Sequence, residues 1–148
     1  MLNVSTSSTS TDAAGNVRRG TRKALRDAAD RGFEVSQEHV SHGADSFLAN
    51  SGYPPEELAD GTWEWGYSAG YAAAVEDGSE PHWIPVHAMD GLERWSRRIL
   101  GDEGAAWAVR HKIAKEGTEA NPFVEPGKEA QEAYLQARGI SASVEREF

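Results

Sequence analysis

The chain has 148 residues, and its 24 Asp and Glu against 15 Lys and Arg give a formal net charge of −9. This length suits one domain, and the acidic balance excludes a protein that coats DNA nonspecifically, because such affinity comes from Lys and Arg contacts with phosphate. The absence of cysteine excludes disulfides, thiol catalysis and thiolate metal sites, and no apolar run approaches the roughly 20 residues of a membrane span.

The first third of the chain predicts a flexible arm followed by a long helix. Residues Asn3 to Gly15 are small and polar without periodicity, which predicts a flexible arm over residues 1–16. From Val17 to about Asn50, apolar residues recur at spacings of mainly three and four, which predicts a helix that Gly32 weakens locally. Residues 51–61 contain two consecutive prolines and are expected to form a loop.

The middle of the chain predicts one strand and one short helix. The alternating, aromatic-rich segment from Thr62 to Tyr67 is typical of a strand. Three alanines favour a short helix over a strand from Tyr71 to Glu76, and residues 77–81 are expected to form a loop.

The last third predicts three further helices. Apolar stripes indicate helices from Ala88 to Ile99, from Ala105 to Glu116 and from Lys128 to Ala137. Residues 121–126 are expected to be extended, and Gly117 is a natural C-cap. The predicted fold class is α+β, with one domain over residues 17–138, a helical insertion at about 86–116 and a C-terminal tail at 139–148.

The charges of the chain are unevenly distributed. Between Gly32 and Glu93 there are 12 carboxylates and no Lys or Arg, whereas the other 86 residues hold all 15 basic residues and 12 acids. Lysine is scarce, with 4 residues against 11 Arg. Excess acid with little lysine is typical of a halophilic host, and a GC-rich genome that encodes an acidic surface is the alternative.

Two histidines offer one candidate metal site. His39 and His42 have i,i+3 spacing, which on a helix places two imidazoles on one face. No motif specifies a third ligand, so two solvated histidines on an acidic helix are the favoured interpretation. A metal-dependent hydrolase is kept as an alternative.

A second pair of histidines flanks an apolar loop. His82 or His87 could act as a general base beside Glu80, but no nucleophile, oxyanion hole or phosphate-cradling loop accompanies them. A structural loop with His82 hydrogen-bonded and Trp83 packed is favoured. We therefore expect no enzyme activity, no metal and no cofactor.

Two basic clusters could bind an acidic partner. Arg18, Arg22 and Arg26 share one helix face at i,i+4 spacing. Either this cluster or the second one could contact phosphate or the acidic stretch of a neighbouring copy, and the net charge favours the copy. A small nucleic-acid-binding module is the remaining alternative. The second cluster consists of Arg94, Arg97 and Arg98.

Short motifs in a particular order give the chain a resemblance to a known family. Tyr71-Ala72-Ala73-Ala74-Val75-Glu76-Asp77-Gly78-Ser79 is followed at a distance by Gly117-Thr118 and by Pro122-Phe123-Val124-Glu125-Pro126. The order resembles the neck, or head–tail joining, family of long-tailed double-stranded DNA viruses, whose members are often described as tail components or tail-completion proteins. In that family a long helix and a strand precede Tyr-Ala-x-x-Val-Glu-x-Gly-Thr, and Pro-Phe-x-x-Pro precedes a C-terminal helix. Segments around Pro81, Trp83 and Trp95 are similar to a longer subtype with a helical insertion.

The resemblance implies a structural virion protein without catalytic residues. Such a protein forms a homo-oligomeric ring, expected to be a hexamer, from a long N-terminal helix packed on a small antiparallel sheet, a helical insertion and a C-terminal helix. It joins the head connector or head-closure ring to the tail-terminator or tail-tube proteins and lines the channel through which double-stranded DNA passes without specific binding. Its implied location is the neck or tail region of the virion, and the host cytoplasm before assembly, with no membrane partner.

A closed head-to-tail ring needs two different complementary surfaces on each subunit, which an acidic middle and basic flanks could supply. The motif and interface candidates are Tyr71, Val75, Glu76, Gly78, Pro81, Trp83, Trp95, Gly117, Thr118, Pro122, Phe123, Pro126, Arg18, Arg22 and Arg26.

Overall fold

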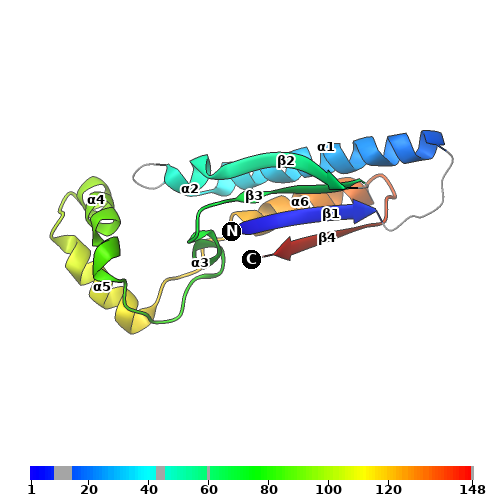
Figure 1. Cartoon of the computed structure of the whole chain (residues 1–148). Helices are drawn as coiled ribbons and strands as arrows, with labels where there is room; N and C mark the ends of the chain where they lie inside the picture. The colour runs from blue at the N-terminus through cyan, green and yellow to red at the C-terminus, as the bar shows by residue number, and fades with distance from the viewer. Residues whose placement is uncertain (9–14, 43–45, 60, 148) are drawn as a thin grey trace.

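The computed structural model describes residues 1–8, 15–42, 46–59 and 61–147, with the backbone alone for residues 8, 15–19 and 59. Within these ranges the fold is α+β, as the sequence predicts, with six α-helices and a four-stranded antiparallel sheet (Figure 1). The elements are β1 (Leu2–Ser8), α1 (Gly15–His39), α2 (Phe47–Asn50), β2 (Gly52–Ala59), β3 (Thr62–Tyr67), α3 (Ala72–Asp77), η1 (Val86–Ala88), α4 (Met89–Ile99), α5 (Ala105–Glu116), α6 (Val124–Gln136) and β4 (Ala142–Glu147).

The strands lie in the order β2-β3-β1-β4, and α1 and α6 cover one face of the sheet (Figure 1). The opposite face, toward the viewer in Figure 1, is open. Side chains alternate between the two faces along each strand, so every second residue of β1, β3 and β4 belongs to the open face.

The expected flexible arm is wrong for Leu2–Ser8, which forms a central strand of the sheet. Leu2, Val4 and Thr6 are fully buried beneath the helices, so these residues alternate with the period of two that a half-buried strand requires. The serines and threonines between and after them concealed this pattern in the sequence. Residues 9–14 of the expected arm lie outside the described residues.

The expected C-terminal tail is also wrong, because β4 pairs with β1 along its length from Asn3↔Glu147 to Ser8↔Ala142. Both terminal strands lie outside the expected domain limits of 17–138. The sheet needs them, since without β1 the strands β3 and β4 have no common neighbour.

The expected helix over 17–50 is divided into two. α1 ends at His39, and α2 is a separate turn preceded by Ser46 with a φ of 52°. The loop expected at 51–61 holds β2 instead, which tolerates Pro54 and Pro55 because it is an edge strand with register shifts beside β3. Gly43 lies outside the described residues.

The helices α1 and α6 cross closely at two glycines. A Cβ on Gly127 would lie 2.4 Å from the carbonyl oxygen of Gly32 and 2.9 Å from Trp65. Beside this crossing, the indole Nε1 of Trp65 donates to Gln131 Oε1 at 2.8 Å, and Gln131 Nε2 donates to Thr6 Oγ1. Gly32, read from the sequence as a weak point of a helix, therefore permits the main helix–helix contact.

The remaining helices agree closely with the sequence. The predicted strand at Thr62–Tyr67, the short helix α3 and the helices α4 and α5 are confirmed, with α5 at the predicted bounds. α6 begins at Val124 rather than at Lys128, so the extended segment expected at 121–126 is wrong from Val124 onward. Pro126 is compatible with this earlier start because the first helical turn needs no N–H from it.

The helices α4 and α5 form a hairpin that extends beyond one end of the sheet (Figure 1). We call residues 80–117 the insertion hairpin. Its own buried side chains are few, namely Met89, Ser96 and Ala106.

Candidate interaction surfaces

The first motif of the resemblance caps the helix that begins in the second motif. Glu76 is 1% exposed, and its Oε2 accepts hydrogen bonds from the backbone N–H groups of Phe123 at 2.7 Å and Val124 at 2.8 Å. Its Oε1 accepts one from the N–H of Glu125 at 2.8 Å, and Arg146 Nη1 lies 3.3 Å from the same oxygen. The carboxylate thus satisfies backbone donors that a helix N-terminus leaves unpaired and lies at the positive end of the helix dipole.

The two segments that end in Gly and a hydroxyl residue are hydrogen-bonded to each other. Ser79 and Thr118 exchange backbone N–H···O hydrogen bonds of 3.0 Å in both directions, and their hydroxyl oxygens are 2.7 Å apart. We call this pair the Ser79–Thr118 bridge. It joins the two ends of the insertion hairpin. The hairpin therefore leaves and re-enters the rest of the domain, which we call the body, at one point.

The glycines beside the bridge meet two requirements at once. Gly78 and Gly117 have φ values of 76° and 73°, a region that other residues rarely adopt. A Cβ on Gly117 would lie 2.0 Å from the carbonyl oxygen of Ser79, and one on Gly78 would lie 2.6 Å from that of Thr118. The Gly-Ser and Gly-Thr pairs therefore form one closely packed junction.

The other motif residues divide between core and surface. Phe123 is fully buried and contacts Tyr67 edge-on at 4.9 Å between ring centroids, and the carbonyl oxygen of Val75 accepts from Asn121 N–H at 2.8 Å. Tyr71 is 46% exposed and stacks on the exposed ring of Phe47. Trp95 and Pro126 are half-buried, whereas Pro81 and Pro122 are exposed.

The N-terminal basic cluster contacts its own chain. Arg22 pairs with Glu57 of β2, with 2.6 Å between Nη2 and Oε1, and Arg26 lies 3.9 Å from Asp30 and above the ring of Trp63. Arg22 thus has a partner in the acidic stretch of its own copy, and its contact with a neighbouring copy stays a prediction. The side chain of Arg18 lies outside the described residues.

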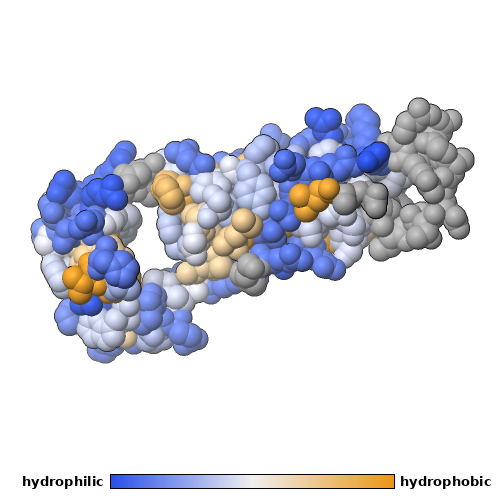
Figure 2. Space-filling model, in the orientation of Figure 1, coloured by the Kyte–Doolittle hydropathy of each residue, from blue (hydrophilic) through white to orange (hydrophobic). Residues whose placement is uncertain are grey.

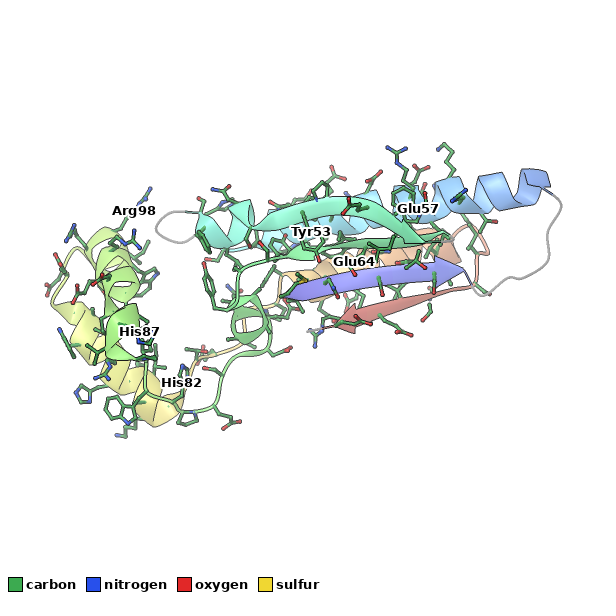
Figure 3. The ribbon with its side chains drawn as sticks, viewed as in Figure 1. Tyr53, Glu57, Glu64, His82, His87 and Arg98 are labelled. Carbon is green, nitrogen blue, oxygen red and sulfur yellow. The ribbon has the colours of Figure 1, made fainter. Side chains whose placement is uncertain are left out.

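The histidines do not gather into one site. His39 ends α1, with Nδ1 2.9 Å from the carbonyl oxygen of Val35, and His42 lies beyond the helix, so the expected shared helix face is wrong. His82 and His87 are both exposed on the insertion hairpin (Figure 3). His82 Nδ1 lies 2.9 Å from the carbonyl oxygen of Glu80, as the structural-loop interpretation predicts. Within the described ranges, no group of three or more His, Cys, Asp or Glu side chains could hold a metal ion.

The α5 side of the insertion hairpin presents a cationic and aromatic surface. The guanidinium of Arg110 lies 4.9 Å from the ring centroid of Trp83 and 5.6 Å from that of Trp107, and its Nε donates to Ile84 O at 2.8 Å. Trp83 is 56% exposed and Trp107 is 46% exposed, so the prediction that Trp83 is packed is wrong. His111 contacts Trp83 edge-on at 5.2 Å.

The open face of the sheet is acidic. Cross-strand pairing places Glu64 of β3 and Glu145 of β4 on either side of Ser5, with Glu56 of β2 beyond Glu64 and Glu147 of β4 beside Asn3. The ion pairs found among the described residues involve none of these four carboxylates. In Figure 2 the body seen from this side carries blue hydrophilic residues beside pale and orange ones.

Tyr53 reports the electrostatics of the open face. Its hydroxyl donates to Glu64 Oε1 at 3.2 Å, and the two side chains lie side by side on the sheet (Figure 3). Burial, together with the charge of Glu64 and the hydrogen bond to it, raises the pKa of Tyr53 to about 12. Burial of the Tyr53 hydroxyl, and secondly the negative charge of Glu64, oppose the appearance of a further negative charge at this position.

Sequence reasoning missed both the open face and the aromatic part of the hairpin surface. The four carboxylates belong to three strands, of which only β3 was predicted, so nothing in the sequence placed them together. A signal for the hairpin surface was present, because residues 105–115 contain Arg110, His111, Lys112 and Lys115 and no acidic residue.

None of the helices in the part of the chain that the structure describes is long and apolar enough to cross a membrane. Comparison of the chain with models of protein families, with curated proteins and with solved structures finds no match.

Proposed function

We propose that the chain is a structural virion protein that forms a ring in the neck of a long-tailed virus and joins the head connector to the tail. The proposal rests on the order of the motifs, as the sequence presents them. The observation that carries it furthest is the capping of α6 by Glu76, because it makes the Tyr71–Ser79 and Pro122–Pro126 motifs one structural unit.

The fold is consistent with an assembly role. A long helix packs on a small antiparallel sheet, followed by a helical insertion and a C-terminal helix, in the arrangement that the resemblance implies. The formal charge of the insertion hairpin as a whole is zero, but residues 105–115 of α5 are basic. Each copy thus carries an acidic open face and a cationic side of α5, which are two different and complementary surfaces of the kind that a head-to-tail ring requires. Carboxylates facing a channel would also offer DNA phosphates nothing to bind.

Deletion of the gene from the genome of the virus that carries it tests the proposal. We expect the infected cells to produce DNA-filled heads and separate tails, visible by electron microscopy, and almost no infectious particles. The intact gene supplied in trans is the control and should restore joined particles. Normal, infectious particles from the deletion virus would contradict the proposed function.

A further inference from the structure

We propose that the cationic face of the insertion hairpin of one copy docks on the acidic open sheet face of the next copy, an inference that rests on the proposed ring. The two surfaces belong to different ends and layers of the same molecule. Their contact therefore repeats from copy to copy and can close into a ring.

The acceptor surface is the middle of the open sheet face. Glu64 and Glu145 flank Ser5 across neighbouring strands, and the short side chain of Ser5 is half-buried between these two carboxylates, whereas Asn3 Oδ1 is buried. Side-chain hydroxyls are the polar contacts found for two of these carboxylates, from Tyr53 to Glu64 and from Ser143 to Glu145. A cationic partner would relieve the repulsion among four carboxylates on one face.

The donor surface is the exposed side of α5. Trp107, His111, Lys112 and Lys115 are all exposed and recur at helical spacing, so they lie on one side of the helix. Exposed Trp and Arg are the residue types most enriched at the centres of protein interfaces. Arg110 fixes the position of Trp83 and Trp107, because its guanidinium contacts both rings and its Nε is held by Ile84 O.

The two surfaces do not satisfy each other within one copy. The insertion hairpin extends beyond the end of the sheet instead of folding back over the open face (Figure 1). The Ser79–Thr118 bridge fixes the hairpin at its base, so it projects as a unit toward a neighbour. The hairpin thus lies where it can contact another copy. The charges of the α5 side and of the open sheet face are complementary.

Cross-linking of the full chain tests this contact. Because the chain has no natural cysteine, the cross-linker can react only with the cysteines that are introduced. Ser5→Cys in the open face and Ala108→Cys in α5 are introduced together, and a short bis-maleimide is added at high protein concentration. We expect a ladder of dimers, trimers and larger species on a denaturing gel. The matched control combines Ser5→Cys with Gly20→Cys, on the exposed side of α1, and should give at most a trace of the ladder.

Charge exchange adds a second, independent readout. Lys112→Glu with Lys115→Glu should reduce the ladder at least tenfold, and so should Glu64→Lys with Glu145→Lys. All four substitutions together should restore it. The wild-type charges should also lose the ladder as salt rises from 50 mM to 1 M, because screening shortens the range of the attraction from about 14 Å to about 3 Å. Circular dichroism melts check that each variant is folded.

The outcomes separate this inference from the proposed function. Equal ladders from the test and control pairs, no ladder, or no rescue by the four substitutions would each overturn the docking inference. If the deletion virus still yields unjoined heads and tails, the proposed function stands without it. If virus particles that carry the Lys112→Glu and Lys115→Glu variant lose their packaged DNA while cross-linking of the variant is unchanged, the hairpin contacts DNA instead of a neighbouring copy. This outcome would also overturn the inference.

Discussion

Glu76 links three parts of the chain that lie far apart in sequence. It belongs to α3, its oxygens accept from the first residues of α6, and Arg146 of the edge strand β4 contacts it at the end of the sheet next to α3. Such a buried carboxylate is tolerated only because every partner is present, since an unpaired buried charge costs several kcal/mol.

Replacing Glu76 with Gln tests this capping role. The amide keeps one acceptor oxygen, but its NH₂ group would face the N–H of Glu125 and the guanidinium of Arg146, leaving donors unpaired. We expect the free energy of unfolding to fall by about 3 kcal/mol, measured by urea denaturation.

The control for this substitution is Glu119→Gln, which makes the same chemical change at an exposed position. It should alter the free energy of unfolding by no more than about 0.5 kcal/mol. A similar loss in both variants, or no loss at Glu76, would show that the carboxylate does not stabilise the start of α6.

Residue roles of this kind were only partly predictable. The resemblance named Glu76 as a motif residue but gave it no role. Its partners are backbone groups 47 to 49 residues away, and no local sequence pattern predicts such contacts. The hydrogen bond of His82 within its loop was predicted correctly, since it depends on a neighbour two residues away. Local contacts can be read from sequence, whereas long-range ones depend on the topology.

At the scale of elements, periodic helices were predicted better than polar strands. α4 and α5 have apolar stripes that only a helix explains, and their bounds agree with the structure. β1 has the strand period in Leu2, Val4 and Thr6, but the surrounding serines hid it, and its partner β4 is equally polar. Burial under α1 and α6 gives these strands their stability. Burial and strand pairing both depend on residues far away in the sequence, so the local sequence of each strand does not predict them.

The crossing of α1 and α6 depends on the absence of side chains at two positions. Gly127→Ala would place a Cβ against the Gly32 backbone and the Trp65 ring, neither of which can move freely. We expect a loss of about 1–3 kcal/mol in the free energy of unfolding, in spite of the better helix propensity of alanine.

Gly20→Ala is the matched control in the same helix pair, because a Cβ there would meet no atom within 4 Å. It should raise the free energy of unfolding by up to about 1 kcal/mol. If both substitutions stabilise the protein, the close crossing of the helices is wrong.

At the scale of the whole molecule, the acidic stretch from Gly32 to Glu93 is not one surface. Glu57 pairs with Arg22 and Glu76 caps α6, so these two carboxylates stabilise the chain itself. Glu56 and Glu64 lie instead on the open face, where the C-terminal strand β4 adds Glu145 and Glu147. The sequence showed the charge imbalance, but only the strand order shows which carboxylates are available to a partner.

The body and the insertion hairpin are expected to be separable. None of the described residues in the two core clusters lies between Ser79 and Thr118, and the bridge holds these two residues as hydrogen-bonded neighbours. Asn-Gly in place of residues 80–117 should therefore close the chain with a two-residue hairpin turn. We expect a cooperatively folded body whose melting temperature is within a few degrees of that of the intact chain.

The same shortened chain should lose assembly while it keeps its fold. In the deletion virus it should fail to join heads to tails, because each copy retains the acidic open face but lacks the cationic side of α5 that we propose docks on the open face of the next copy. The full chain supplied in trans is the control. A shortened chain that joins particles normally would show that the hairpin is dispensable for assembly, and one that cannot fold would show that the hairpin belongs to the body.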